Sequence, residues 1–383
     1  MMEFDRVLET RIRQRLENFE LNGLSRRLVP PAGIDLSSND YLQFASHPLL
    51  KERMCSAILQ EGCGSTGSRL LRGDRSCFSD IEKRFAAFKD TEAALYFSSG
   101  YAANLAVLST FLEDSDVVFF DRLNHASLID GIKLGKARKI LFSHNDLAAF
   151  EHYLRSISTT GQRFLVVESL FSMDGDIAPL SEYAALCKEA GVALIVDEAH
   201  AIGLYGDRGS GLIESTGIAN DTFLSINPAG KALGLAGAFV AGPQWAIDYL
   251  MQRGRTFVFS TALPPAMAAA LGAALDLIGE GPELRHRLHR LTSLLRGMLF
   301  DQGLDIARHG TQIIPVLVGD NARALSLARS LQLDGFDVRA IRPPSVPDGS
   351  ARLRICVNTG LDETILERFS SSLHSALSSL GAR

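Results

Sequence analysis

Between about residue 79 and residue 242, short apolar runs alternate with segments whose apolar residues recur every three or four positions. Because the short runs are apolar on both faces, the strands they form must be covered on both sides, and strands separated by helices pair mainly in parallel. The pattern therefore predicts an α/β unit with a mainly parallel seven-stranded sheet. The predicted strands are residues 93–97, 116–121, 138–143, 163–168, 192–197, 222–226 and 237–242.

The alternation of short apolar runs with helical patterns ends after "ALPP" at residues 262–265. Two long helical patterns, at about 265–279 and 284–303, precede "QIIPVLVG", a helix, "FDVRAI", "ARLRICV" and a last helix. This order predicts a smaller α+β domain, and a chain of 383 residues exceeds the usual size of one core. The predicted division is a helical arm at 1–44 that joins the small domain, a large domain at 45–249 and the small domain at 250–383.

Composition excludes several classes of protein. A net charge of −5 and a pI near 6.0 give no electrostatic signal for nucleic acid. The amino terminus mixes both charge signs and lacks the apolar core of a signal peptide. The most apolar segment, Ala262–Gly279, contains a proline pair and Asp276 and falls short of the roughly 20 apolar residues that span a membrane. The five cysteines form no C-x-x-C pair, which favours reduced thiols in the cytoplasm and no metal site.

A string of polar residues, Asp197-Glu198-Ala199-His200, follows the apolar run "VALIV". It is typical of Mg²⁺-dependent ATPases and of pyridoxal phosphate enzymes, and a strand that simply ends in polar residues is the third interpretation. An ATPase also needs G-x-x-x-x-G-K-[ST]. Both Gly-Lys pairs, at 135–136 and 230–231, are followed by Ala, and Asp130 and Ser225 stand where the first Gly is required. The ATPase interpretation is therefore disfavoured.

The parts of a pyridoxal phosphate site are present elsewhere in the chain. Lys231 lies in the small-residue loop "GKALGLAGAFVAG", where a cofactor can approach the backbone closely. "FSSGYAANLAVL" (97–108) predicts a strand, a turn and a helix start, which binds phosphate well. His125 follows a strand at another helix start and could face the ring. Each feature alone is ordinary, but together with Asp197 they favour this cofactor.

These stretches also resemble the α-oxoamine synthases, a family of fold-type I pyridoxal phosphate enzymes that condense an amino acid with an acyl thioester and release CO₂. The similar segments run through nearly the whole chain in family order. They are residues 37–42, 64–73, 97–104, 121–127, 168–180, 196–211, 230–234, 259–265 and 341–355. The last of them, "IRPPSVPDGSARLRI", is similar to the branch of the family that serves biotin biosynthesis. The resemblance implies L-alanine and a pimeloyl thioester as substrates, with either coenzyme A or acyl carrier protein as the acyl carrier.

The resemblance assigns catalytic roles to four residues. Lys231 would form the Schiff base with the cofactor and then remove the Cα proton of alanine. Asp197 would pair with the pyridinium nitrogen, which keeps the ring able to accept electrons. His200 would hydrogen-bond the phenolic oxygen with Ser172 nearby, and His125 would stack on the ring.

Further residues are implied for binding. Gly100 and Tyr101 would offer backbone N–H groups to the phosphate, and Glu168 would support the site from behind. Ser260 and Thr261 would reach the site of a neighbouring subunit, so a homodimer is expected. The residues expected to bind substrate are Arg354, for the carboxylate of the amino acid, Arg26 and Ser345, for the acyl donor, and Asn39.

Two positions depart from the family pattern. Pro228 stands where the family usually has a Thr that donates to the phosphate, and Gln43 replaces a Gly near the expected acyl entrance. Two alternatives to the expected activity stay open at this point. One is an α-oxoamine synthase with another amino acid or acyl donor, and the other is a non-catalytic protein of the same fold.

Overall fold

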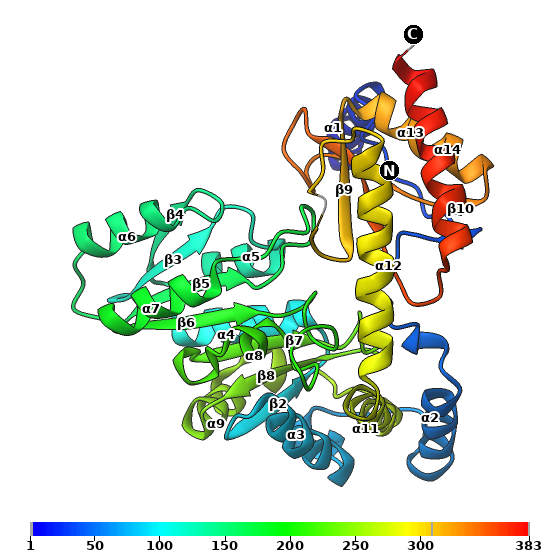
Figure 1. Cartoon of the computed structure of the whole chain (residues 1–383). Coiled ribbons are helices and arrows are strands. Elements are labelled where there is room, and N and C mark those ends of the chain that lie inside the picture. Colours follow the sequence, from blue (N-terminus) through cyan, green and yellow to red (C-terminus); the bar gives the residue numbers. More distant parts are fainter. Residues whose placement is uncertain (1–2, 308, 382–383) are drawn as a thin grey trace. The chain divides into compact units, whose positions relative to one another are not determined.

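The computed structural model describes residues 3–307 and 309–381. These residues form two compact units (Figure 1). The large unit comprises residues 39–172 and 176–288, and the small unit comprises the described residues up to Ser38, residues 173–175 and those from His289 onwards. Both units mix helices and strands, as the sequence predicted.

The boundary between the units differs from the predicted one at 249/250. Helix α11 (Pro265–Glu280) belongs to the large unit because it packs on α2 (Pro48–Glu61) and α3 (Ser76–Lys89). Arg84 of α3 donates to the carbonyl oxygen of Gly272 at 2.9 Å and to the carboxylate of Asp276 at 2.5 Å. The proline pair at 264–265, after which the sequence pattern changes, therefore starts a helix within the large unit.

The large unit is built on the predicted seven-stranded sheet. Its order is β2-β8-β7-β6-β5-β3-β4, and only β8 runs antiparallel to its neighbours. β7 begins two residues later than predicted and ends at Pro228, while the other strand bounds agree within one residue. The strands are β2 (Ala93–Phe97), β3 (Val117–Asp121), β4 (Arg138–Phe142), β5 (Arg163–Glu168), β6 (Val192–Asp197), β7 (Leu224–Pro228) and β8 (Ala238–Gly242).

Helices cover both faces of this sheet because successive strand side chains point to opposite sides. Val118 and Phe120 of β3 belong to a core shared with α4 (Gly100–Phe111) and α5 (Ala126–Leu134). Phe119, between them, packs instead on Phe150 of α6. Two-sided burial explains why the strands read as continuous apolar runs. The remaining helices of the large unit are α6 (Leu147–Ser156), α7 (Leu180–Ala190), α8 (Leu212–Thr216), α9 (Gln244–Arg253) and α10 (Arg255–Val258).

The small unit has a three-stranded antiparallel sheet of order β11-β12-β9 and a separate parallel pair, β1 with β10. The segment "FDVRAI" therefore forms two short strands that join different sheets, where the sequence suggested one. The small unit also receives three residues from the middle of the chain, since Arg352 pairs with Asp174 and Thr311 donates to the carbonyl of Gly175. The strands are β1 (Ile34–Asp35), β9 (Ile313–Gly319), β10 (Phe336–Asp337), β11 (Ala340–Ile341) and β12 (Ala351–Cys356).

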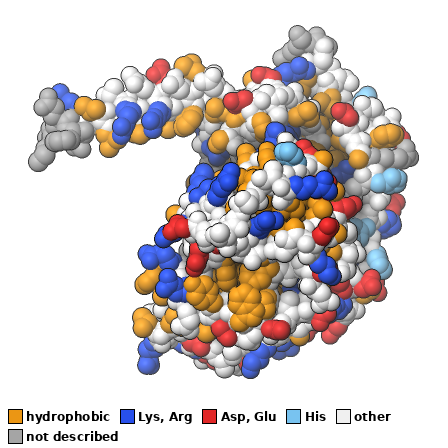
Figure 2. Space-filling model, turned by 90° about the vertical axis from the view of Figure 1, so that its left-hand side faces the viewer, with side chains coloured by type: hydrophobic (Ala, Val, Ile, Leu, Met, Phe, Trp, Pro, Cys, Tyr) orange, Lys and Arg blue, Asp and Glu red, His pale blue; other side chains and the backbone are white. Residues whose placement is uncertain are grey.

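The helices of the small unit are α1 (Glu3–Leu21), α13 (Asn321–Leu333) and α14 (Glu363–Gly381). Helix α12 (Pro282–Asp301) begins in the large unit and continues into the small unit. Within residues 3–307 and 309–381, no helix combines the length and the hydropathy needed to cross a membrane. On the face shown in Figure 2, Lys and Arg side chains are interspersed with Asp and Glu. This face carries mixed charge, as the net charge of −5 suggests.

Candidate active site

The carboxyl ends of the central parallel strands meet at one edge of the large sheet. β5 ends at Glu168 and β6 at Asp197, and these two residues are paired in register. A cavity of about 480 Å³ lies at this edge, entirely within the large unit. Open α/β sheets bind ligands at the carboxyl ends of their strands, so this cavity is the candidate active site.

Besides Glu168 and Pro228, the cavity brings together seven residues for which the sequence predicts a role in catalysis or binding. They are Asn39, Gly100, Tyr101, His125, Asp197, His200 and Lys231. These residues are spread over almost two hundred positions of the chain, so only the folding of the sheet makes them neighbours. Their roles stay predictions.

Asp197 begins a hydrogen-bonded network that ends at His125. Its carboxylate is 4 % exposed and accepts the backbone N–H of Ala199 and the side-chain amide of Asn104, each at 2.9 Å. The same amide group of Asn104 donates to Ser127 Oγ at 2.8 Å, and Ser127 Oγ lies 2.7 Å from His125 Nδ1. Because these contacts come from β6, α4 and α5, the network ties the acid to the imidazole across three elements.

His125 is held in a neutral form by its surroundings. Burial lowers the pKa of His125, Asp197 partly offsets this effect, and Lys231 lowers the pKa further. Its Nδ1 accepts the backbone N–H of Ser127 at 3.2 Å, which requires an unprotonated Nδ1. A neutral imidazole can pack on an aromatic ring and can exchange a proton near pH 7.

Glu168 lines the cavity behind His125. Its carboxyl group is almost fully buried and accepts the backbone N–H of His125 at 2.5 Å. Burial, then the charge of Asp197, raises the pKa of Glu168 to about 8, against the opposing effect of Lys231. Glu168 is therefore largely protonated at neutral pH, and its carboxyl group adds little charge to the cavity.

His200 is positioned by a residue that the sequence reasoning missed. The hydroxyl group of Tyr41, whose side chain is fully buried, lies 2.7 Å from His200 Nδ1. Asn104 was missed as well, although it hydrogen-bonds Asp197. Both residues lie inside segments that resemble the family, "SSNDYL" and "FSSGYAAN", but nothing in those segments says which side chain points to the cavity.

The amino terminus of α4 lies at the cavity, and its first turn has the chemistry of an anion-binding site. Ser99 caps the helix, because its Oγ accepts the N–H of Ala102 and its carbonyl accepts the N–H of Ala103. The N–H groups of Gly100 and Tyr101 have no hydrogen-bond partner among the described residues, as expected for a first helical turn. A Cβ atom at Gly100 would lie 2.6 Å from Pro228 Cγ, so only glycine fits here. Free N–H groups and the helix dipole together favour a dianion.

Lys231 lines the same cavity as the start of α4 and the acid network. It follows β7 in a tight loop, in which its carbonyl accepts the N–H of Gly234 at 2.8 Å. At the base of the loop, Ala229 donates to the carbonyl of Gly237 at 2.8 Å. The loop is thus fixed at both ends, and its lysine lines the same cavity as His125 and Asp197.

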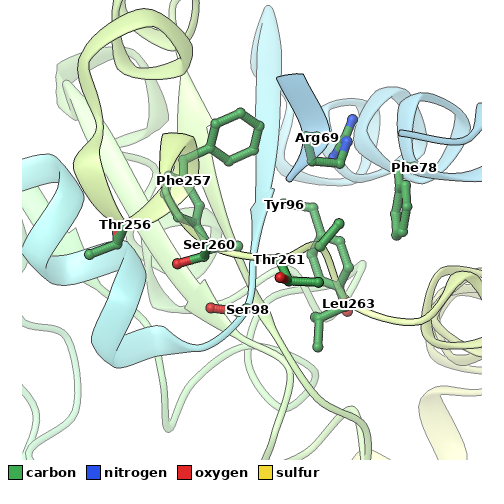
Figure 3. A pocket seen from close by; sticks show the side chains of 11 residues that line it. Arg69, Phe78, Tyr96, Ser98, Thr256, Phe257, Ser260, Thr261 and Leu263 are labelled. Atoms are coloured by element: carbon green, nitrogen blue, oxygen red, sulfur yellow. The ribbon is translucent and has the colours of Figure 1, made fainter. Parts of the chain in front are cut away.

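Three predicted residues of the large unit lie outside this cavity. Ser260 and Thr261 line a second, smaller hollow with Ser98, shown in Figure 3. Ser98 lines both hollows, so the two hollows adjoin within the large unit. Ser172 follows β5 at the end of a large-unit segment and is not among the residues that line the cavity.

The remaining predicted residues belong to the small unit. Arg26 donates to Ser345 Oγ at 3.3 Å, so these two residues of distant sequence are neighbours. Arg354 is buried on β12, and its Nη1 lies 2.9 Å from Cys356 Sγ. Their roles toward substrate stay predictions.

Comparison with known proteins identifies the class of this chain. A profile of the family "Aminotransferase class I and II" matches residues 31–373, and the chain belongs to this family. The family consists of pyridoxal phosphate enzymes, so the chain is an enzyme of this class with pyridoxal phosphate as its cofactor. Its architecture is the fold-type I transferase fold that the resemblance implied.

The curated relatives include the 8-amino-7-oxononanoate synthase of Geobacter sulfurreducens, which is 45% identical over 87% of this chain and 86% of its own length. The synthase of the same name from Marinobacter nauticus is 42% identical over 89% of this chain and 86% of its own length. Among solved structures, serine palmitoyltransferase from S. paucimobilis superposes with a TM-score of 0.91 at 25% identity over 100% of both chains. The 8-amino-7-oxononanoate synthase of Francisella tularensis gives 0.79 at 28% identity over 91% of this chain and 99% of that chain.

The cavity fits this cofactor chemically. The free N–H groups of α4 suit its phosphate, and the carboxyl group of Asp197 suits a protonated ring nitrogen. Lys231 would provide the amine for covalent attachment, and the neutral His125 would provide a flat partner for the ring. Gly100, which packs closely against Pro228, has no side chain that would stand in the way of the phosphate.

We expect the cofactor to be attached to Lys231. The purified protein should be yellow, and borohydride reduction followed by peptide mass mapping should label Lys231 alone. Lys231→Ala should stay folded, with unchanged far-UV circular dichroism, and should lose the label. A label on another lysine, or on none, would show that the lysine was assigned wrongly.

Pro228 lines the cavity, whereas the nearby polar residues Ser225 and Asn227, which have donors to offer a phosphate, do not. Asn227 donates to Ser225 Oγ at 2.9 Å, and both side chains are buried away from the cavity. A hydrogen bond to a charged group is worth about 1.5–3 kcal/mol. We therefore expect Pro228→Thr to bind pyridoxal phosphate about tenfold more tightly, because a tenfold change in affinity corresponds to about 1.4 kcal/mol.

Equilibrium dialysis of the apoprotein against pyridoxal phosphate measures this effect. Pro228→Val is the matched control, since valine has the shape of threonine without the hydroxyl group. If the Thr variant binds no more tightly than the Val variant, the phosphate lacks no donor at this position.

Proposed function

We propose that this chain catalyses the decarboxylative condensation of L-alanine with a pimeloyl thioester. The products are 8-amino-7-oxononanoate, CO₂ and a free thiol, in biotin biosynthesis. Relatives with 41–45% identity over most of the chain bear this enzyme's name, which supports the proposal. The structural observation that carries it is the network from Asp197 through Asn104 and Ser127 to His125, with Lys231 in the same cavity.

Each residue of the cavity has a separate role in the proposed reaction. When bound, pyridoxal phosphate supplies a conjugated ring that accepts electrons from the α-carbon of the amino acid. The carboxylate of Asp197 keeps a proton on the ring nitrogen, and Asn104 and Ala199 hold that carboxylate in place. The amine of Lys231, once released, removes the Cα proton of L-alanine.

His125 would orient the ring and exchange protons during condensation. Its backbone is fixed by Glu168 and its Nδ1 by Ser127, so the ring has little freedom to turn. His200, held by Tyr41, would donate to the phenolic oxygen. Arg354 would bind the carboxylate of alanine through its two-pronged guanidinium group. Arg26 and Ser345 would bind the acyl donor, and Asn39 would bind substrate within the cavity.

We propose that the working unit is a cytoplasmic homodimer. Leu71 and Phe259 of the large unit are 84% and 74% exposed, and Phe259 adjoins Ser260 and Thr261. Large apolar side chains at the surface favour burial against another protein surface. A second copy of the chain would cover them, and Ser260 and Thr261 would then reach the partner's cavity.

A second candidate function is supported by the structural comparison. Serine palmitoyltransferase superposes with the higher TM-score, although its identity is only 25%. It is a different enzyme with, by its name, a different amino acid and a longer acyl group. The curated synthases at up to 45% identity weigh more, because substrate choice depends on side chains and not on the backbone path.

The holoenzyme should form 8-amino-7-oxononanoate from L-alanine and a pimeloyl thioester. The assay offers alanine, glycine and serine with acyl thioesters of several lengths, and follows thiol release and product mass. Lys231→Ala is the inactive control. Faster turnover of serine with a palmitoyl thioester would favour the second candidate, and no turnover of any pair would favour a non-catalytic role.

Arg354→Ala should raise the KM for alanine far more than the KM for the acyl thioester. The expected increase is at least tenfold, because each lost hydrogen bond to a carboxylate costs about 1.5–3 kcal/mol. Arg354→Lys, which keeps the charge but loses the fork, should recover part of the affinity. If the acyl donor's KM rises and that of alanine does not, Arg354 serves the other substrate.

A further inference from the structure

A cluster of charged side chains lies at the carboxyl ends of β4, β3 and β5, which are neighbours in the large sheet (Figure 1). Its centre is His144, which follows β4 and is half-buried. The imidazole stands between two carboxyl groups. Its Nδ1 lies 3.0 Å from Asp121 Oδ1, and its Nε2 lies 2.6 Å from Asp176 Oδ2. None of these three residues lines the cofactor cavity, so any effect of the cluster on that cavity acts through other residues.

This geometry requires a protonated imidazole. A carboxylate only accepts hydrogen bonds, so an imidazole that bonds a carboxylate through each ring nitrogen must carry a proton on both. Burial lowers the pKa of His144, but the hydrogen bonds and the charges of Asp121 and Asp176 outweigh burial and raise this pKa to about 10. His144 is therefore a cation held between two acidic side chains at neutral pH.

The first carboxyl group supports the turn that carries His125. Asp121 is fully buried at the end of β3, and its Oδ1 also accepts the backbone N–H of Leu123 at 2.7 Å. This bond fixes the start of the turn after β3, which reaches His125 two residues beyond Leu123. The position of Asp121 therefore bears on the position of His125.

The second carboxyl group lies in the hairpin that carries Ser172. In this hairpin, residues 169–178, the N–H of Phe171 donates to the carbonyl of Asp176 at 3.0 Å. The ring of His144 packs at a right angle to that of Phe171, with 4.4 Å between the ring centres. His144 thus contacts both sides of the hairpin, at the residue before Ser172 and at Asp176.

Asn145 makes the same bridge as its neighbour His144. Its φ of 51° lies in the left-handed region, which asparagine adopts more readily than most residues. In this conformation its backbone N–H donates to Asp121 Oδ2 at 2.8 Å, and its side-chain amide donates to Asp176 Oδ2 at 2.7 Å. Two successive residues of the loop between β4 and α6 therefore bind the same two carboxyl groups.

We propose that His144 is a positioning residue of the active site, which ties the turn that carries His125 to the hairpin that carries Ser172. Both of these residues are expected to contact the cofactor, so the inference rests on the proposed function of the site. A displacement of about 1 Å at a catalytic group can cost about a hundredfold in rate, and such groups therefore need fixed supports. His144 joins two of these supports, which follow different strands of the sheet.

His144→Gln removes the positive charge and leaves one donor group in a side chain of similar size. The apoprotein of this variant should bind pyridoxal phosphate about tenfold more weakly in equilibrium dialysis, which is the effect of losing about one hydrogen bond. The holoenzyme should also show a weaker visible circular dichroism band, because this band depends on how firmly the protein holds the bound ring. His152→Gln is the matched control, since His152 is exposed on α6 and does not line the cavity.

Two changes at Asp176 test the same bridge from its other end, and they decide the question if His144→Gln does not fold. Asp176→Asn keeps an oxygen that can accept from His144 Nε2, so the cofactor affinity and the visible band should stay near those of the wild type. Asp176→Ala removes this acceptor and should behave as His144→Gln does. The side chain of Asp176 is 38% exposed, so neither change opens a cavity in the core.

Unchanged cofactor affinity and an unchanged visible band in His144→Gln, or in Asp176→Ala where the first variant does not fold, overturn the proposal. A loss of the same size in His152→Gln overturns it as well, because the effect would then not depend on the bridge.

A stability control separates positioning from a general loss of stability. Phe150→Leu alters the core, where Phe150 packs on Phe119 and Phe142. If it lowers the melting temperature as much as His144→Gln and weakens cofactor binding equally, the proposal is overturned, because the loss would follow stability and not position. All these measurements contain no substrate. Absence of turnover in the wild type would therefore contradict the proposed function and leave the result on His144 standing.

Discussion

The parallel pairing of β5 with β6 is the constraint on which the candidate site depends. In register, this pairing sets Glu168 beside Asp197 at the carboxyl edge of the sheet. Two carboxyl groups so close, and both nearly buried, cannot both be ionised at low cost. Asp197 receives two hydrogen bonds and Glu168 one, and the pKa of Glu168 rises to about 8. The cavity thus holds a neutral carboxyl group at Glu168 beside Asp197, the residue that we expect to pair with the ring nitrogen.

The neighbouring acid, Glu198, shows how one short string serves two purposes. Its carboxylate is fully buried and pairs with Lys89 Nζ at 2.5 Å, and it also accepts the N–H groups of Leu212 and Ile213. Glu198 therefore fastens α3 and the start of α8 to the end of β6. Removing one partner of such a pair leaves an uncompensated buried charge, which typically costs about 3–5 kcal/mol. In the string Asp197-Glu198-Ala199-His200, the first and last residues line the cavity, and Glu198 stabilises the fold.

Much of the fold was predictable because the strands are short and apolar throughout. Six of the seven strands of the large sheet lie within one residue of their predicted bounds, and the seventh is shifted by two. The division of the chain was less accurate, since α11 belongs to the large unit. A helix of small apolar residues can pack equally well on either unit, so its sequence does not say which one it joins. The residues Tyr41 and Asn104 were missed for a related reason, because their partners are 159 and 93 positions away.

The sequence by itself determined the class of fold and the cofactor, and it named the lysine, the acid and the histidines that we expect to serve that cofactor. These depend on local patterns and on motifs that keep their spacing along the chain. The tertiary structure alone decided which side chains touch: Asn104 with Asp197, Glu168 with His125, and Pro228 against Gly100. It also placed His144 between Asp121 and Asp176, which follow different strands of the sheet. Contacts and electric fields act through space, and a linear order of residues does not contain those distances.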